Sequence, residues 1–60
     1  MKTANVSFES PSRIERMRVM DGPFQHSAYG WAYQVAPLDG KSGSVIVPES
    51  RVSDIQDSAQ

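Results

Sequence analysis

The chain has 60 residues, carries a formal net charge of −1 and contains no cysteine. A chain of this length forms one domain at most and buries only about 60% of the surface that its unfolded form exposes, so we expect marginal stability. Without cysteine it has no disulfide and no thiolate metal site, and a single histidine, His26, argues against a histidine metal site. Self-association is then the stabilising device that remains open, and no metal or cofactor is expected.

Charge is nearly balanced overall but is distributed unevenly along the chain. Residues 1–20 hold four basic and two acidic side chains, whereas residues 21–60 hold two basic and five acidic ones. A dedicated DNA-binding domain usually carries a stronger basic footprint. The N-terminus lacks the apolar run of a signal peptide, and no stretch is long enough to span a membrane. We therefore expect a soluble cytoplasmic protein without membrane contact.

The first predicted strand is "NVSFES", residues 5–10, in which Val6 and Phe8 alternate with polar residues. The next segment, "SPSRIERMRVMDGP", fits two structures. As a helix it begins with an N-cap serine and ends at a Gly-Pro pair. As a strand it points Met17 inward and two arginines, Arg16 and Arg18, outward, with a turn at the Gly-Pro pair. Local propensity favours the helix, and the β character of residues 29–47 favours the strand.

The segment "GWAYQVAPLDGKSGSVIVP" predicts a β-hairpin. A strand near 29–36 precedes a turn built on Asp39-Gly40 and Ser42-Gly43, and a second strand over 44–47 stops at Pro48. The first strand places large side chains on one face, namely Tyr29, Trp31, Tyr33 and Val35. Its other face carries small or polar ones, namely Gly30, Ala32, Gln34 and Ala36. "PESRVSDI" indicates one 3₁₀ or α turn held down by Val52 and Ile55, and residues 57–60 form a frayed polar tail.

Residues 17–35, "MRVMDGPFQHSAYGWAYQV", resemble the KOW motif of transcription elongation factors and ribosomal proteins. Met17 and Val19 stand for the apolar pair of its first strand, Gly22-Pro23-Phe24 for its turn, and Gly30 for the glycine that opens the next strand. The resemblance implies an SH3-like small five-stranded barrel over residues 1–56 and contact with RNA or a nucleoprotein complex. The fold class expected for the chain is therefore all-β, with a short 3₁₀ or α turn near the C-terminus.

A second resemblance runs through "SGSVIVPESRVSDI", which is similar to the C-terminal strand and turn of the plasmid-encoded type II dihydrofolate reductases. Those proteins are small SH3-like barrels that act as tetramers, and their activity needs a Val-Gln-Ile-Tyr run on this strand. This chain has Ser-Val-Ile-Val at residues 44–47 and lacks both the amide and the phenol. The resemblance therefore supports the barrel and not the activity, and no small-molecule substrate is expected.

The aromatic face is the main candidate for function, because it can either fill the core or remain at a rim where a base, a proline or a cation stacks. We favour the core interpretation, because a small barrel needs large side chains to fill it. At least one ring should still be half exposed, since tyrosine and tryptophan have a polar group that needs a partner. The residues predicted to bind RNA or a protein partner are Arg16, Arg18, Phe24, Tyr29, Trp31 and Tyr33. The arginines can equally form a solvated strand face paired with Glu9 or Glu15.

The opposite face of the same strand carries small residues that would let another backbone approach closely. Gly30, Ala32 and Ala36 are therefore candidates for contact with a second copy of the chain. No paired carboxylates or Ser-His-Asp set stand out as catalytic groups. We expect a non-enzymatic binding module that contacts RNA or a nucleoprotein complex, with a protein–protein or self-association module as the alternative.

Overall fold

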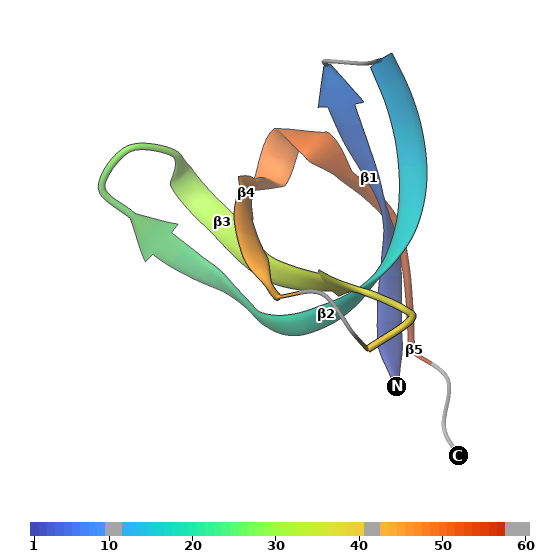
Figure 1. The fold of residues 1–60 in the computed structure, drawn as a ribbon. Coiled ribbons are helices and arrows are strands. Elements are labelled where there is room, and N and C mark those ends of the chain that lie inside the picture. Colours follow the sequence, from blue (N-terminus) through green and yellow to red (C-terminus); the bar gives the residue numbers. More distant parts are fainter. Residues whose placement is uncertain (10–11, 41–42, 58–60) are drawn as a thin grey trace.

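The computed structural model describes residues 1–9, 12–40 and 43–57 (Figure 1). It confirms the predicted all-β class, with five antiparallel strands in a single sheet of order β4-β3-β2-β1-β5. A 3₁₀ turn, η1, stands between the fourth and fifth strands, where the sequence predicts a short turn. The elements are β1 (Lys2–Glu9), β2 (Ser12–His26), β3 (Gly30–Pro37), β4 (Val45–Pro48), η1 (Glu49–Arg51) and β5 (Val52–Asp57).

The sheet is strongly curved, and Figure 1 shows its strands curling around a common interior. β4 and β5 are its two edges, and among the described residues no pairing joins them. None of the described residues forms a helix long and apolar enough to cross a membrane. Of the tail expected over 57–60, Asp57 belongs to β5, and residues 58–60 lie outside the described residues.

β2 settles the ambiguous segment as a strand. It pairs with β1 in a register that sets Met17 opposite Ala4 and Arg16 opposite Asn5. Met17 is buried, and Arg16 and Arg18 lie on the other face, because successive side chains of a strand alternate between faces. The side of the sheet expected for each of these residues is thereby confirmed. The helix propensity of β2 is overridden because this strand pairs with β1 on one side and with β3 on the other.

The turn predicted at Gly22-Pro23-Phe24 is wrong. β2 continues to His26, and the chain reverses over residues 27–29 instead. The Gly-Pro pair, joined by a cis peptide bond, lies in an irregular part of β2 where the register with β3 shifts on both sides of Asp21. Gly22 has φ 119°, a conformation that favours glycine. A Gly-Pro pair can mark a bulge as well as a turn, and here it bends a long strand.

The other predicted turn, at Asp39-Gly40, agrees with the structure. Gly40 has φ 71°, and its N–H donates to the carbonyl oxygen of Pro37 at 3.3 Å. Gly supplies the positive φ that a tight reversal needs. Of the Ser42-Gly43 pair also expected in this turn, Gly43 lies outside the strands and Ser42 lies outside the described residues.

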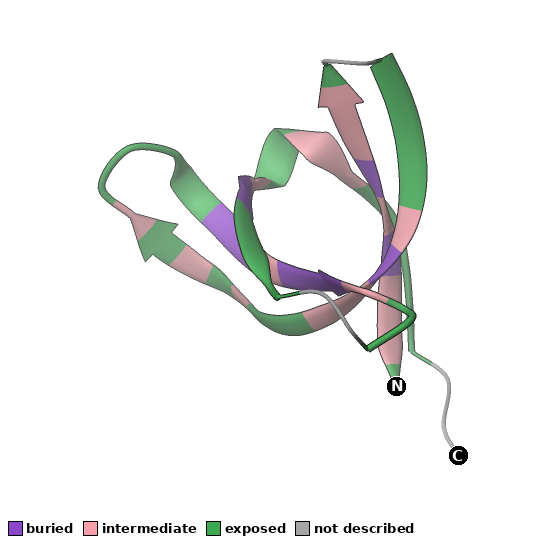
Figure 2. Cartoon of the chain, viewed as in Figure 1, coloured by how far each residue is buried: buried purple, intermediate pink, exposed green. Residues whose placement is uncertain are grey.

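The core is small and lies on the concave face of the sheet. Among the residues that the structure describes, Val6 and Val35 are the only large side chains that are fully buried. Figure 2 shows the buried positions where β1, β2, β3 and β4 surround the interior. The prediction that Ile55 holds the C-terminal turn down is wrong, since Ile55 is 43% exposed on β5. The core consists of Val6, Met17, Tyr33, Val35 and Val47, with Phe8, Val19 and Val52 packed against it.

Candidate partner-binding surface at the hairpin tip

The β2–β3 hairpin extends beyond the strands that flank it. β1 pairs with β2 only over residues 12–18, and β4 pairs with β3 only over residues 32–35. The remaining part of the hairpin is therefore two-stranded, and Figure 1 shows it reaching away from the body of the sheet. We call residues 25–31, which form the end of this projection, the hairpin tip. Its sequence is Gln-His-Ser-Ala-Tyr-Gly-Trp, without a lysine, arginine, aspartate or glutamate.

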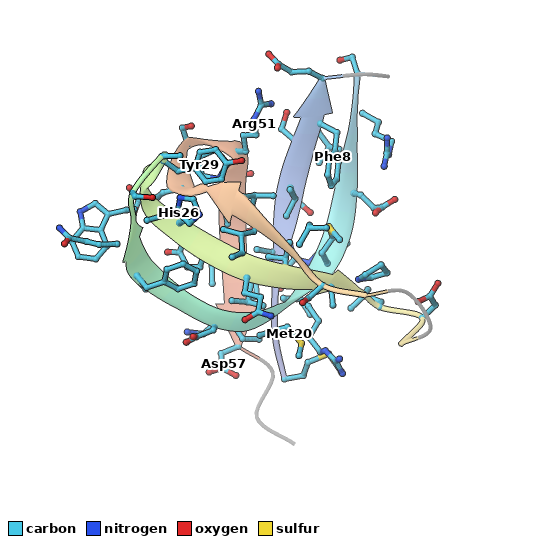
Figure 3. The ribbon with its side chains drawn as sticks, turned by 60° about the vertical axis from the view of Figure 1, so that its left-hand side comes forward. Phe8, Met20, His26, Tyr29, Arg51 and Asp57 are labelled. Carbon is cyan, nitrogen blue, oxygen red and sulfur yellow. The ribbon has the colours of Figure 1, made fainter. Side chains whose placement is uncertain are left out.

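Two half-exposed aromatic rings distinguish the hairpin tip. Tyr29 is 49% exposed and Trp31 is 51% exposed. The ring of Tyr29 stacks on that of His26, with centroids 4.6 Å apart and planes 18° from parallel (Figure 3). Nδ1 of His26 accepts a hydrogen bond from the N–H of Ala28 at 3.1 Å. The stack and this hydrogen bond both span the turn, so they restrict how the aromatic surface can move.

The structure divides the aromatic residues of β3 between core and surface. Tyr33 pairs with Val47 of β4 and is only 7% exposed, whereas Trp31 pairs with Gln25 in the two-stranded region. Both side chains point to the same face of β3, but of the two only Tyr33 lies in the part of β3 that pairs with β4. The core interpretation is therefore correct for Tyr33 and Val35 and wrong for Trp31. Phe24, another predicted contact residue, is half-buried opposite Ala32.

Arg16 is engaged within the chain. Its guanidinium donates from Nε and Nη2 to Oγ1 of Thr3 at 3.1 and 2.8 Å, and from Nη1 to Oδ1 of Asn5 at 3.1 Å. Nη1 also donates to the backbone oxygen of Asp54 at 2.9 Å and to its Oδ2 at 3.1 Å. Arg16 thus connects β2 to β1 and β5. A phosphate contact would have to compete with this network.

Two further arginines form ion pairs, and Arg18 is partly buried. Arg13 pairs with Glu15 at 3.7 Å, and Arg51 pairs with Glu9 at 2.6 Å. Arg18 is half-buried opposite Ala36, and its Nε is buried without a hydrogen-bond partner in the part of the chain described. None of these side chains belongs to the hairpin tip. The two glutamates therefore do pair with arginines, but with Arg51 and Arg13 rather than with Arg16 and Arg18.

The small residues of β3 are mostly covered. Ala32 is fully buried and Ala36 nearly so, whereas Gly30 is exposed in the hairpin tip. Their contact with a second copy stays a prediction, and the burial of the two alanines does not favour it. Within residues 1–9, 12–40 and 43–57 there is neither a pocket nor a group of three potential metal ligands.

Two features were missed from the sequence. The stack of His26 on Tyr29 follows from two rings three residues apart across a short turn, a spacing visible in "HSAY". The second is the exposure of Val45 and Ile46 on the edge strand β4. An uncharged "VIVP" run could have indicated an open edge, but the strand order is needed to show that no described strand pairs with one side of it.

Comparison of the chain with protein-family models, with curated proteins and with solved structures yields no match. The interpretation of the hairpin tip consequently depends on its geometry and chemistry.

Proposed function

We propose that the chain is a non-enzymatic binding module with an SH3-like barrel fold, and that it holds a protein segment against the hairpin tip. The observation that carries the proposal is the pair of half-exposed rings, Tyr29 and Trp31, on a hairpin tip without lysine, arginine, aspartate or glutamate. Tyrosine and tryptophan are the residue types most enriched where binding energy concentrates in protein interfaces. Here they are presented at the end of the molecule, where an extended partner can reach both.

The barrel part of the proposal is supported by the order of elements. Four strands follow one another as an antiparallel meander, and a 3₁₀ turn then leads into β5, which returns to pair with β1. The curvature of the sheet brings its two edge strands around the same interior (Figure 1). This connectivity and curvature are typical of SH3-like barrels, in which rim aromatics contact the ligand.

An RNA partner also suits exposed aromatic rings, because bases stack on them. Such surfaces combine the rings with a positively charged groove that follows the phosphates. The hairpin tip has no lysine or arginine, and three of the chain's arginines are held in ion pairs elsewhere. These observations favour a protein segment, whose binding at an uncharged tip depends on ring burial rather than on phosphate contacts.

The proposal is tested by selecting peptides from a random displayed library against the wild-type chain and measuring their affinity for variants. Trp31→Ala and Tyr29→Ala should each weaken binding by about tenfold or more, because each removes a ring buried by the partner. Ile14→Ala is the matched control, since Ile14 is an exposed apolar side chain on β2 far from the hairpin tip. It should leave the affinity unchanged.

Titration of single-stranded RNA at low and high salt completes the test. We expect no RNA binding that depends on Trp31. Peptides that bind the two tip variants as well as the wild type would contradict the proposal. So would RNA binding that is lost in Trp31→Ala and falls steeply with salt, which would assign the hairpin tip to nucleic acid.

A further inference from the structure

The edge strand β4 has a backbone that is paired on one side only. It pairs with β3 through Val45 opposite Val35 and Val47 opposite Tyr33, and no described residue pairs with its other side. Unpaired N–H and C=O groups on an edge are a template for another strand. From this edge we propose a self-association site: two copies of the chain pair antiparallel through β4 and join their sheets. The site is distinct from the hairpin tip.

β4 is short, but it lacks the charged side chains and the irregular backbone that commonly protect an edge. Its sequence Val-Ile-Val-Pro carries no charge, and the exposed side chains of Val45 and Ile46 favour a strand. Only Pro48, at its end, blocks pairing, because proline has no N–H.

The other edge, β5, is protected in several ways. Asp54 has φ 49°, which interrupts the extended backbone, and the register with β1 shifts between Thr3 and Asn5. The carboxylates of Asp54 and Asp57 add charge along this strand. Charges and irregular backbone on an edge oppose pairing with another chain. The contrast assigns association to β4 rather than to β5.

A second copy is the occupant that the chain itself supports. Two uncharged strands can pair about a two-fold axis without placing like charges opposite each other. Association would also add stability that the small core does not supply: within the described part of the chain, Val6 and Val35 are the only large side chains that are fully buried, and the sequence has no cysteine for a disulfide. Domains of this size commonly use association to make up for a small core.

We place the two-fold axis of the proposed dimer at Ile46. Antiparallel pairing centred there sets Ile46 opposite the same residue of the second copy and Val45 opposite Val47. Pro48 then falls at the margin, where its missing N–H does no harm. Because Val35 faces the core and Ile46 is opposite Gln34, the two Ile46 side chains meet on the convex face of the joined sheet.

Sedimentation of the full chain over a concentration series tests the proposal, with one variant on each edge. Ile46 and Ile55 are the same residue type at 41% and 43% exposure, on β4 and β5 respectively. We expect the wild type to dimerise within the range of about 10 µM to about 1 mM, as a small interface allows. Ile46→Lys should weaken the dimer by about tenfold or more, since two lysines would then face each other. Ile55→Lys should not.

Cross-linking provides a second measurement that does not rely on a disruptive change. The chain has no cysteine, so Ile46→Cys introduces a unique thiol. Directly opposed side chains are close enough for a disulfide, and mild oxidation should give a covalent dimer. Ile55→Cys should stay monomeric under the same conditions. A wild type that is monomeric throughout the series would overturn the proposal, as would a dimer that Ile55→Lys dissociates and Ile46→Lys does not.

Discussion

At the scale of single residues, Gly22 leaves the space beside β2 that the ring of Tyr33 occupies. A Cβ added at Gly22 would lie 2.8 Å from Cδ1 of Tyr33 and 2.9 Å from the backbone oxygen of Ala32. The backbone of Gly22 also has φ 119°. The absence of a side chain therefore allows the Tyr33 ring to lie against β2 and enter the core.

Gly22→Ala should lower the free energy of unfolding by about 2–4 kcal/mol, because it combines backbone strain with a steric clash. Gly30→Ala is the control, since Gly30 has φ 77° but nothing lies within 4 Å of its added Cβ. Gly30→Ala should lower the free energy of unfolding by about 1 kcal/mol, which is the backbone strain alone. Urea denaturation of the two variants measures both values. Equal losses would show that the contact with Tyr33 contributes nothing.

The sequence predicts the face of the strand to which Trp31 and Tyr33 point, but not that Tyr33 is buried and Trp31 exposed. Alternation places both rings on one face, and this is correct. Whether a ring on that face is buried depends on how far β4 extends along β3, which is a matter of register between strands distant in the chain. The same limit applies to Arg16, whose outward direction was predictable, whereas its acceptors on β1 and β5 were not.

At the scale of elements, Arg16 is the side chain that connects β2 to the strands beyond it. Its hydrogen bonds reach Thr3 and Asn5 on β1 and Asp54 on β5. β5 is an edge strand that pairs with β1 alone, and its first residues follow directly from η1. We therefore regard Arg16 as a residue that fixes β5 to the sheet.

Arg16→Met should lower the free energy of unfolding by about 1–3 kcal/mol, because the partners Thr3 and Asn5 are part-buried and would lose a charged donor. Arg13→Met is the control, as Arg13 makes an exposed ion pair with Glu15 and lies 4.5 Å over the Phe8 ring. It should cost no more than about 1 kcal/mol. Thermal and urea unfolding compare the two. Similar losses would mean that Arg16 is only another solvated surface charge.

Elements are predicted correctly where the pattern of apolar and polar residues within a segment identifies a strand. They are predicted wrongly where the structure of a segment depends on partners distant in the chain. β1 and β3 lie close to their predicted positions because each has a clear two-residue period, and β4 does so because a turn and a proline bound its short apolar run. β2 was ambiguous because its amphipathic pattern fits both a helix and a strand. The sequence around Gly22 indicated a turn, and a strand of 15 residues with a bulge was not foreseen, since its length is set by two different partners.

At the scale of the whole molecule, a small core supports a sheet with one projecting hairpin and one open edge. Neither surface carries a lysine, arginine, aspartate or glutamate, but the two differ in kind. The hairpin tip offers aromatic rings, and β4 offers unpaired backbone groups beside aliphatic side chains. The hairpin tip and β4 share no residue, and we expect association through β4 to leave Tyr29 and Trp31 exposed. A dimer would therefore present two hairpin tips to its partners.

The most direct test of this account is the fluorescence of Trp31, the chain's single tryptophan, recorded with acrylamide across a concentration series. We predict a red-shifted, readily quenched emission at every concentration, because the ring is half exposed and lies outside the β4 interface. Addition of a selected peptide should shift the emission to the blue and protect it from quenching. A blue, protected emission in the free chain would contradict the assignment of Trp31 to the binding surface. An emission that turns blue only as concentration rises would show that the hairpin tip itself is the contact between copies.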